Sequence, residues 1–245
     1  MEISLASEQI THFFGFPITN TLLLSWVVMG ILITLGAVST YRLNAVPRGL
    51  QNALEAVIEK LFALVKSVIG TDKDTEKVFP FIVTFFVFIL VSNWFGLIPG
   101  VGTIGVEHGQ GDQRMFLPFL RAPTSDLNTT LAFAFISVII TNIFGIATIG
   151  FTKYAGKFIS FKSPIAFFVG ILESVAEIAK ILSFSFRLFG NVFAGEVLLV
   201  VIASLIPYIA PIPFLGLEVF VGFIQALVFS MLTLVFIKVA ITAAH

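Results

Sequence analysis

The fold is decided by the stretch Ser183-Phe184-Ser185-Phe186-Arg187-Leu188-Phe189-Gly190-Asn191-Val192-Phe193-Ala194-Gly195-Glu196. This stretch places a guanidinium inside an apolar run that extends from Pro164 to Ile206 without another proline. A permanently charged arginine is costly in hydrocarbon, so at this depth it normally faces a cavity, a polar partner or another subunit. Arg187 is therefore the first candidate for a functional residue.

Further polar residues lie at helical spacing around Arg187. Steps of four, three, seven and four residues separate Glu173, Glu177, Lys180, Arg187 and Asn191. This spacing predicts one polar face on one helix. Glu196 lies five residues beyond Asn191 and is turned by roughly 140° from that face. The glutamates and the lysine either neutralise one another as buried ion pairs or line a path for ions.

The composition indicates an α-helical membrane protein. Hydrophobic residues make up 58% of the 245 residues and charged residues 11%, and the mean hydropathy is +1.05. The net charge is zero and the basic residues are scattered, which argues against a nucleic-acid partner. Without cysteine there is no disulfide framework and no cysteine metal site. No loop has the spacing of a metal site, so neither a metal nor a cofactor is expected.

The pattern predicts one all-α, polytopic membrane domain with about five membrane helices. Residues 20–41, 78–98 and 127–151 are each apolar and long enough to cross a core of about 30 Å. Residues 49–70 carry apolar residues at helical spacing opposite polar ones, which predicts an amphipathic helix in the membrane interface or docked on a partner subunit. A charged linker at 71–77 follows, and the other connections lie at 1–19, 99–126 and 152–163.

The last two helices are predicted to be unusually long. As a single helix, residues 164–206 would measure about 64 Å, which is twice a perpendicular crossing. The polar face keeps its helical phase, so a continuous tilted helix is preferred to a re-entrant hairpin. A proline-rich break then allows residues 214–243 to return as a second long, tilted helix. An antiparallel pair results, and Lys238 is expected to reach cytoplasmic headgroups.

The distribution of basic residues predicts the orientation. Residues 42–77 and 152–163 together hold nine Lys and Arg residues, whereas residues 1–19 and 99–126 hold two. By the positive-inside rule the amino terminus faces outward, the 152–163 loop is cytoplasmic and the carboxyl terminus is cytoplasmic.

Four more polar residues lie in or beside the predicted spans. Asn93 either bonds at a helix end or lines a water path, and Asp126 either caps the next helix or does the same. Glu218 and Gln225 are seven residues apart, on one face of the last helix. Glu196 and Glu218 either hold a proton between them across the helix pair or are buried acids bonded to local hydroxyls.

The central stretch also carries a resemblance to a known family. The run from Arg187 to Glu196 resembles the signature of the a subunit of F-type ATP synthases, the stator subunit that conducts ions beside the rotating c-ring. Further matches are Ser92-Asn93-Trp94-Phe95-Gly96-Leu97-Ile98-Pro99, Pro123-Thr124-Ser125-Asp126-Leu127-Asn128-Thr129-Thr130, Glu173 and Gln225. The resemblance covers most of the chain.

The resemblance implies two proton half-channels, a c-ring partner, b subunits of the peripheral stalk and a bacterial plasma membrane. Arg187 would separate the half-channels and drive deprotonation of the rotor carboxylate. Glu196, Glu218 and Gln225 match positions that line the outer route, and Asn191 sits beside the arginine. Some members have His where this chain has Glu218, so carboxylates with water would serve here. The coupling ion, H⁺ or Na⁺, stays open because its binding carboxylate belongs to the rotor.

Two other classes of function were compared with the stator. A stand-alone secondary transporter or ion channel usually shows internal repeats and discontinuous helices, and the segment around Arg187 has no counterpart in the first half. An intramembrane hydrolase would need a nucleophile and a base, but no histidine lies in a predicted span. The sequence favours a stator that is not an enzyme on its own.

Overall fold

The computed structural model describes residues 7–13, 15–41, 49–98, 100–108, 115–158, 163–207 and 209–242. Within these ranges, five helices are long and apolar enough to cross a membrane. They are α1 (Asn20–Tyr41), α3 (Asp72–Gly96), α4 (Leu127–Ile149), α6 (Pro164–Leu205) and α7 (Pro211–Thr242). The prediction of an all-α polytopic membrane protein is confirmed.

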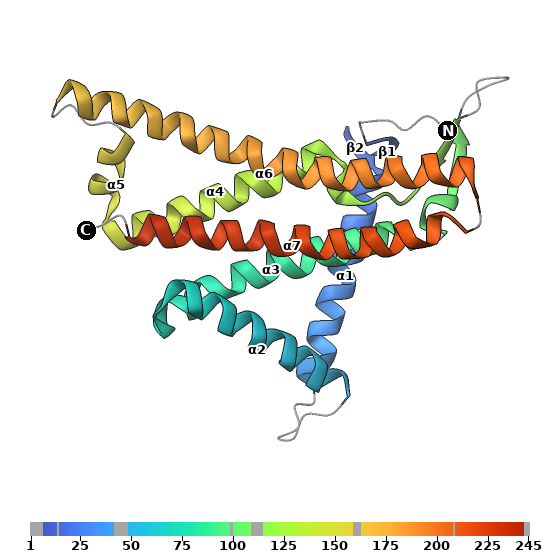
Figure 1. Ribbon diagram of the computed structural model, residues 1–245, viewed down its shortest axis with the longest axis horizontal. Helices are drawn as coiled ribbons and strands as arrows, with labels where there is room; N and C mark the ends of the chain where they lie inside the picture. The colour runs from blue at the N-terminus through green and yellow to red at the C-terminus, as the bar shows by residue number, and fades with distance from the viewer. Residues whose placement is uncertain are drawn as a thin grey trace.

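Helices α6 and α7 form the long antiparallel pair along which the molecule is built (Figure 1). Helix α6 is continuous over 42 residues, about 63 Å, so there is no re-entrant hairpin. It begins where Ser163 accepts a hydrogen bond from the Ala166 amide at 3.1 Å and Pro164 occupies the first turn. The two helices lie close together where the carboxyl end of α6 meets the amino end of α7, and they diverge toward α5, the short helix Phe151–Phe158.

Helices α3 and α4 pack against the long pair and form its core. The buried core residues are Phe85, Phe86 and Ile89 of α3, Ala134 of α4, Phe184 and Leu188 of α6, and Ala226 and Phe229 of α7. The rings of Phe184 and Phe229 lie 5.1 Å apart, within the range of favourable aromatic pairs. Since this core holds one face of α6 against its neighbours, the opposite face of α6 is left exposed.

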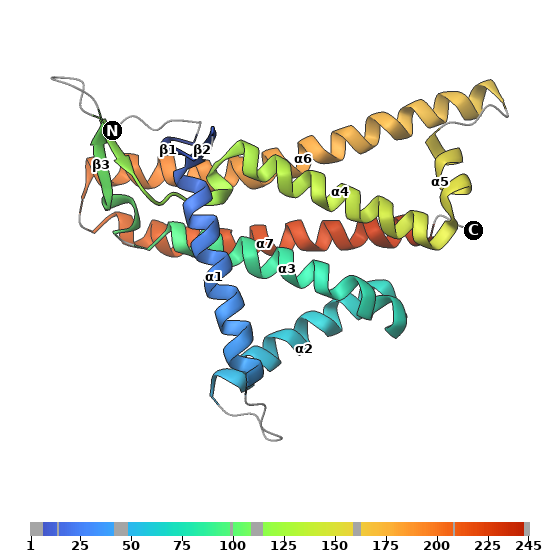
Figure 2. The same ribbon diagram turned by 180° about the vertical axis from the view of Figure 1, so that it is seen from behind.

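Helices α1 and α2 (Leu50–Ile69) complete the helical framework. Figure 2 shows α1 running across α3 and the long pair. The end of α2 packs Val65 and Ile69 against α3 and α7. Lys238 of α7 donates to the Ile69 carbonyl at 2.7 Å, a contact that the sequence does not predict. Its ammonium stabilises the carbonyl end of α2, where unpaired carbonyls carry partial negative charge, and its reach to cytoplasmic headgroups stays a prediction.

Some connecting segments differ from the expected loops. The 1–19 segment contains a hairpin of β1 (Gln9–Phe13) and β2 (Phe16–Thr19), and the 99–126 segment contains a hairpin of β3 (Gly105–His108) and β4 (Met115–Pro118). The 152–163 segment contains α5. Short strands paired only with each other leave too weak a periodic pattern to be read from sequence.

Two helices begin earlier than expected. Helix α3 begins at Asp72 rather than at residue 78 and therefore includes most of the supposed linker. Asp72 and Asp74 lie in its first turn, where negative charge is favourable, and Thr75 bonds back to the Thr71 carbonyl at 2.7 Å. Helix α7 begins at Pro211 rather than at residue 214, because proline is well tolerated in a first turn.

Candidate proton-conducting site

Arg187 lies on the exposed face of α6, away from the α3–α4–α7 core. The next residue, Leu188, is fully buried, and Ser185 bonds to Thr130 of α4 at 3.0 Å. The Arg187 guanidinium is 3.4 Å from the Ser183 hydroxyl, one turn earlier. Among the described residues it forms no ion pair, so its charge is directed outward from the helix bundle.

Asn191 connects the arginine region of α6 to α7. Its side-chain amide donates to the Gln225 side-chain oxygen at 2.6 Å. Gln225 is only 4% exposed, and its own amide nitrogen has no partner within the described structure. A buried donor without a partner is costly, and a water molecule would satisfy this one.

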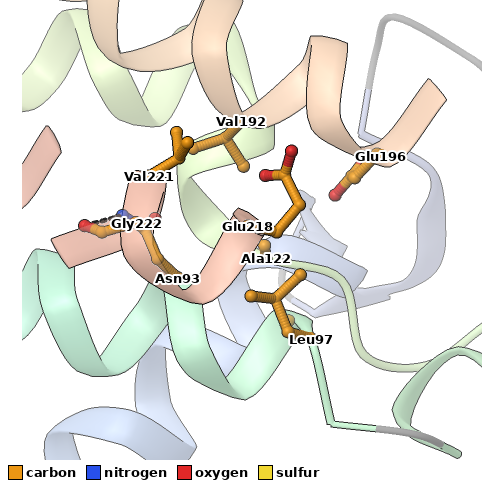
Figure 3. A pocket seen from close by; sticks show the side chains of 9 residues that line it. Asn93, Leu97, Ala122, Val192, Glu196, Glu218, Val221 and Gly222 are labelled. Atoms are coloured by element: carbon orange, nitrogen blue, oxygen red, sulfur yellow. Dashed lines mark hydrogen bonds between the residues drawn. The ribbon is translucent and has the colours of Figure 1, made fainter. Parts of the chain in front are cut away.

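A small cavity lies beside this pair, between α3, α6 and α7, and is called the Glu218 cavity (Figure 3). It has a volume of about 20 Å³, room for about one water molecule. Its lining is Asn93, Gly96, Leu97, Ala122, Val192, Glu196, Glu218, Val221 and Gly222. Two carboxylates, one from each long helix, therefore share one small space.

Glycine at position 195 makes room for the Glu218 carboxylate. A side chain at Gly195 would overlap the carboxylate oxygens of Glu218. Glu218 is 9% exposed and, among the described residues, has no recorded ion pair or hydrogen bond. In Figure 3 its carboxylate points toward the α6 segment that carries Val192. The carboxylate is thus held between two helices without a fixed partner.

Glu196, by contrast, has a cationic partner. Arg121 lies in the segment between β4 and the short 3₁₀ helix η2 (Pro123–Ser125), and its guanidinium is 3.1 Å from the Glu196 carboxylate. The two side chains are 13% and 28% exposed. Sequence reasoning missed this arginine, although it stands two residues before the recognised run that begins at Pro123.

Comparison with known proteins identifies the family. A family model described as ATP synthase A chain matches residues 22–238. The chain is 34% identical over 229 residues to ATP synthase subunit a of Moorella thermoacetica, which is 94% of either chain. This chain belongs to the ATP synthase A chain family. It is therefore a multi-pass membrane protein that forms part of an ATP synthase complex.

Within this member of the ATP synthase A chain family, Asn93 braces the Glu218 cavity. Its amide donates to the Gly222 carbonyl at 3.1 Å, and its oxygen accepts from the Thr124 hydroxyl at 2.6 Å. The side chain thus ties α3 to α7 and to η2. A Cβ added to Gly222 would come within 3.1 Å of Asn93, so the close contact depends on glycine.

Asp126 caps α4 and does not line the cavity. Its carboxylate accepts from the Asn128 amide at 3.2 Å and from the Thr129 hydroxyl at 3.1 Å. These are the contacts of an N-cap residue. The structure therefore places Asp126 at a helix terminus near the site, as the simpler of its two interpretations predicts.

The predicted polar face of α6 is divided between two sites. Glu173 pairs with Lys157 of α5 at 2.6 Å, and Glu177 pairs with Lys180 at 2.6 Å. Both pairs lie toward the amino end of α6, apart from Arg187. Glu177 also lines a pocket of about 430 Å³ between α4, α5 and α6, called the Tyr154 pocket. Its lining is Asn142, Ile146, Phe151, Tyr154, Ala155, Phe158, Ser174 and Glu177.

Tyr154 is the buried titratable group of this pocket. Its hydroxyl donates to the Asn142 side-chain oxygen, and its ring lies where Gly145 has no side chain. Burial, with the charges of Glu177 and Glu173, raises the pKa of Tyr154 to about 12. The phenol therefore stays protonated at neutral pH and acts as a hydrogen-bond donor.

The described residues offer no metal site, since no three His, Asp or Glu side chains come together there. The chemistry available is proton exchange on carboxylates. Of the residues predicted from sequence, the structure joins Asn191 with Gln225, and Glu196 with Glu218 and Asn93. It keeps Glu173 and Asp126 away from the cavity.

Proposed function

We propose that this chain is the proton-conducting stator of a rotary ATP synthase. It provides two half-channels to the c-ring, and Arg187 both drives deprotonation of the rotor carboxylate and blocks a direct leak between the half-channels. Family membership supports the assignment to the complex. The chain's own arrangement of charges supports the mechanism.

The observation that carries the proposal is the outward-facing guanidinium of Arg187 midway along a membrane helix, which forms no ion pair with any described residue of the chain. Arginine does not lose its charge in proteins, and a lone charge in hydrocarbon is costly. Within the described chain the guanidinium reaches only a serine hydroxyl. A carboxylate on a second subunit is the partner that balances it, and a rotor that brings one carboxylate after another meets this need.

The rotor carboxylate must be protonated when it faces lipid, because an ionised carboxylate is not stable there. Close to Arg187 the ionised form is favoured, and the proton leaves. Because Arg187 lies between two separate aqueous routes and blocks direct passage, each proton must be carried from one route to the other on a rotor carboxylate. Each charge then contributes about 2.3 kcal/mol per 100 mV of membrane potential.

The outer route runs through the Glu218 cavity and continues past the Gln225–Asn191 pair toward Arg187. Glu196 and Glu218 line this route together with water, Asn93 braces its wall, and Asp126 caps α4 outside the cavity lining. Glu173 belongs to the route on the other side, near the Tyr154 pocket. This side is cytoplasmic in the proposed orientation, with the amino terminus outside, in a bacterial plasma membrane. The b subunits of the stalk hold the stator in place.

The proposal is tested by replacing Arg187 with Ala and with Lys. Arg187→Ala is expected to assemble but to abolish ATP-driven proton pumping in membrane vesicles. Arg187→Lys is expected to rescue poorly, because an ammonium can lose its proton where a guanidinium cannot. Lys153→Ala, which removes an exposed cation of α5, serves as the matched control and should pump normally. Near-normal pumping by either Arg187 variant would overturn the proposal.

The orientation is tested by labels on the two sides. A cysteine at Lys157 is expected to react with a membrane-impermeant reagent from the cytoplasm, and a cysteine at His108 from outside. The expectation follows from the nine-to-two distribution of basic residues. Reversed labelling at both positions would exchange the two routes.

A further inference from the structure

The two carboxylates of the Glu218 cavity have unequal surroundings. Glu196 is 3.1 Å from the guanidinium of Arg121, and that arginine side chain is largely buried. Glu218 has no such cation within the described residues, and only the missing side chain of Gly195 makes room for it. Two acids that look equivalent in the sequence are therefore not equivalent in the structure.

We propose that Arg121 is a positioning residue that fixes Glu196 as a permanent anion, so that Glu218 alone takes up and releases the proton in this cavity. This inference rests on the proposed function and assigns separate roles within it. Arg121 touches neither the proton nor the rotor. It acts through Glu196, by keeping that carboxylate ionised so that it does not bind the proton.

The first step of the argument is the ion pair. Arginine keeps its charge under all relevant conditions, and its planar fork suits a carboxylate. A proton placed on Glu196 would remove the negative charge that lies 3.1 Å from a largely buried guanidinium, which is unfavourable. Proton exchange at Glu196 is thereby suppressed while Arg121 is present.

The second step is the charge count of the cavity. One guanidinium neutralises one carboxylate, so a charge on Glu218 would be an excess charge in a space that holds about one water molecule. Two acids in one site hold and release protons as a coupled pair. With Glu196 committed to Arg121, the exchangeable proton of the pair resides on Glu218.

Among the residues that the structure describes, no other charged group lines the cavity. From α3 the cavity receives the neutral Asn93, whose amide is bonded to Gly222 and Thr124. The nearby Asp126 is bonded to the start of α4. Arg187 lies on the exposed face of α6, where its guanidinium contacts the Ser183 hydroxyl. The division of roles thus depends on Arg121, Glu196 and Glu218.

The decisive experiment is a set of substitutions in the intact complex, with passive proton flux measured after the catalytic head is removed. Glu196→Gln frees Arg121 to pair with Glu218, so flux should fall by roughly tenfold or more. Arg121→Gln leaves two unneutralised acids and should also lower flux. The double variant Arg121→Gln/Glu196→Gln leaves Glu218 alone in a neutral cavity, and its flux should exceed that of either single variant.

A charge exchange separates this role from a merely structural one. In Arg121→Glu/Glu196→Arg the ion pair is restored, so assembly with the rotor and stalk subunits is expected. The guanidinium now lies on α6 beside Glu218 and holds it ionised, so flux should stay low. A purely structural ion pair would work in either direction, and normal flux in this variant would overturn the inference.

The remaining outcomes distinguish the inference from the proposed function. If the double variant conducts no better than its single parents, Glu218 does not act alone and the inference fails. If Glu218→Gln itself conducts like the parent, protons do not pass through this cavity, and the outer route of the proposed function fails with it. Low flux in Glu218→Gln together with recovery in the double variant supports both.

Discussion

The two ends of α6 treat acidic side chains in opposite ways. Near its amino end, Glu173 and Glu177 each have a lysine at 2.6 Å. Near its carboxyl end, Glu196 pairs with Arg121, whereas Glu218 of α7 has no cationic partner among the described residues. A cationic partner stabilises the charged form of a carboxylate, whereas a buried acid without a counter-ion favours its protonated form. Under the proposed function, counter-ions rather than the acids themselves decide which carboxylate along α6 and α7 relays a proton.

The volume of the space around the acids also differs between the two ends of α6. The Glu218 cavity holds about 20 Å³, whereas the Tyr154 pocket holds about 430 Å³. Gly96, Gly195 and Gly222 have no side chain and therefore allow close packing around the Glu218 cavity. The Tyr154 pocket is lined by residues of α4, α5 and α6, and Figure 1 shows how α5 bridges α4 and the diverging end of α6. A narrow, acidic passage favours transfer along a few groups, whereas a wide one admits bulk water and needs no relay.

The largest effect is expected from removing both acids of the Glu218 cavity. Glu196→Gln/Glu218→Gln should lower passive proton flux on the order of a hundredfold, because no group is left to exchange protons there. The matched change at the other end, Glu173→Gln/Glu177→Gln, should cost only a few-fold, since those acids are held by lysines. Flux is measured in vesicles with the catalytic head removed.

Assembly of both double variants is checked by the amounts of rotor and stalk subunits that copurify. A parental flux in the Glu196/Glu218 double variant would mean that protons enter elsewhere. Equal losses at the two ends would remove the distinction between paired and unpaired acids.

A smaller effect is expected from filling the space beside Glu218. In Gly195→Ala the new methyl group would overlap the carboxylate, so Glu218 must move and flux should fall several-fold. The control is Gly216→Ala in α7, where a side chain meets open space. Replacing glycine by alanine stabilises a helix by about 1 kcal/mol at either position. A difference in proton flux between the two variants therefore reports on the cavity. Equal flux in the two variants would contradict the close packing described here.

The sequence alone was sufficient to predict the membrane helices and to single out Arg187. Long apolar runs and a polar face in constant helical phase predict α6 and α7 as a continuous antiparallel pair. Arg187 is recognised as functional because a charged side chain in such an apolar run is energetically costly. The resemblance to F-type a subunits identified the acids. These features are local in sequence or carried by a motif, so they can be read without coordinates.

The pairing of charges could not be predicted in this way. Arg121 and Glu196 are separated by 75 positions, and only the packing of η2 against α6 brings them together. Helical phase alone grouped Glu173 with Arg187, but Lys157 of α5 takes that carboxylate instead. Lys238 likewise pairs with a carbonyl of α2. Each of these outcomes depends on tertiary contacts between segments distant in sequence.

The smallest expected effect is spectroscopic and concerns Tyr154. The chain has three tyrosines, and an unperturbed tyrosine has a pKa near 10. Because burial and the nearby acids raise the pKa of Tyr154 to about 12, phenolate absorbance should show a late step that Tyr154→Phe removes. The measurement is an alkaline absorbance titration of the assembled complex in detergent.

The direction of the shift also predicts how stability responds to pH. A raised pKa means that the folded chain favours the neutral phenol, so this contribution to stability is fully present below pH 10 and is lost as pH rises through about 12. Glu177→Gln should move the step to lower pH, since one of the charges that raises the pKa is gone. An unshifted step in this variant would mean that Lys180 already cancels the field of Glu177 at the phenol. The amino end of α6 would then be even more fully neutralised than its ion pairs indicate, which would widen its contrast with the Glu218 cavity.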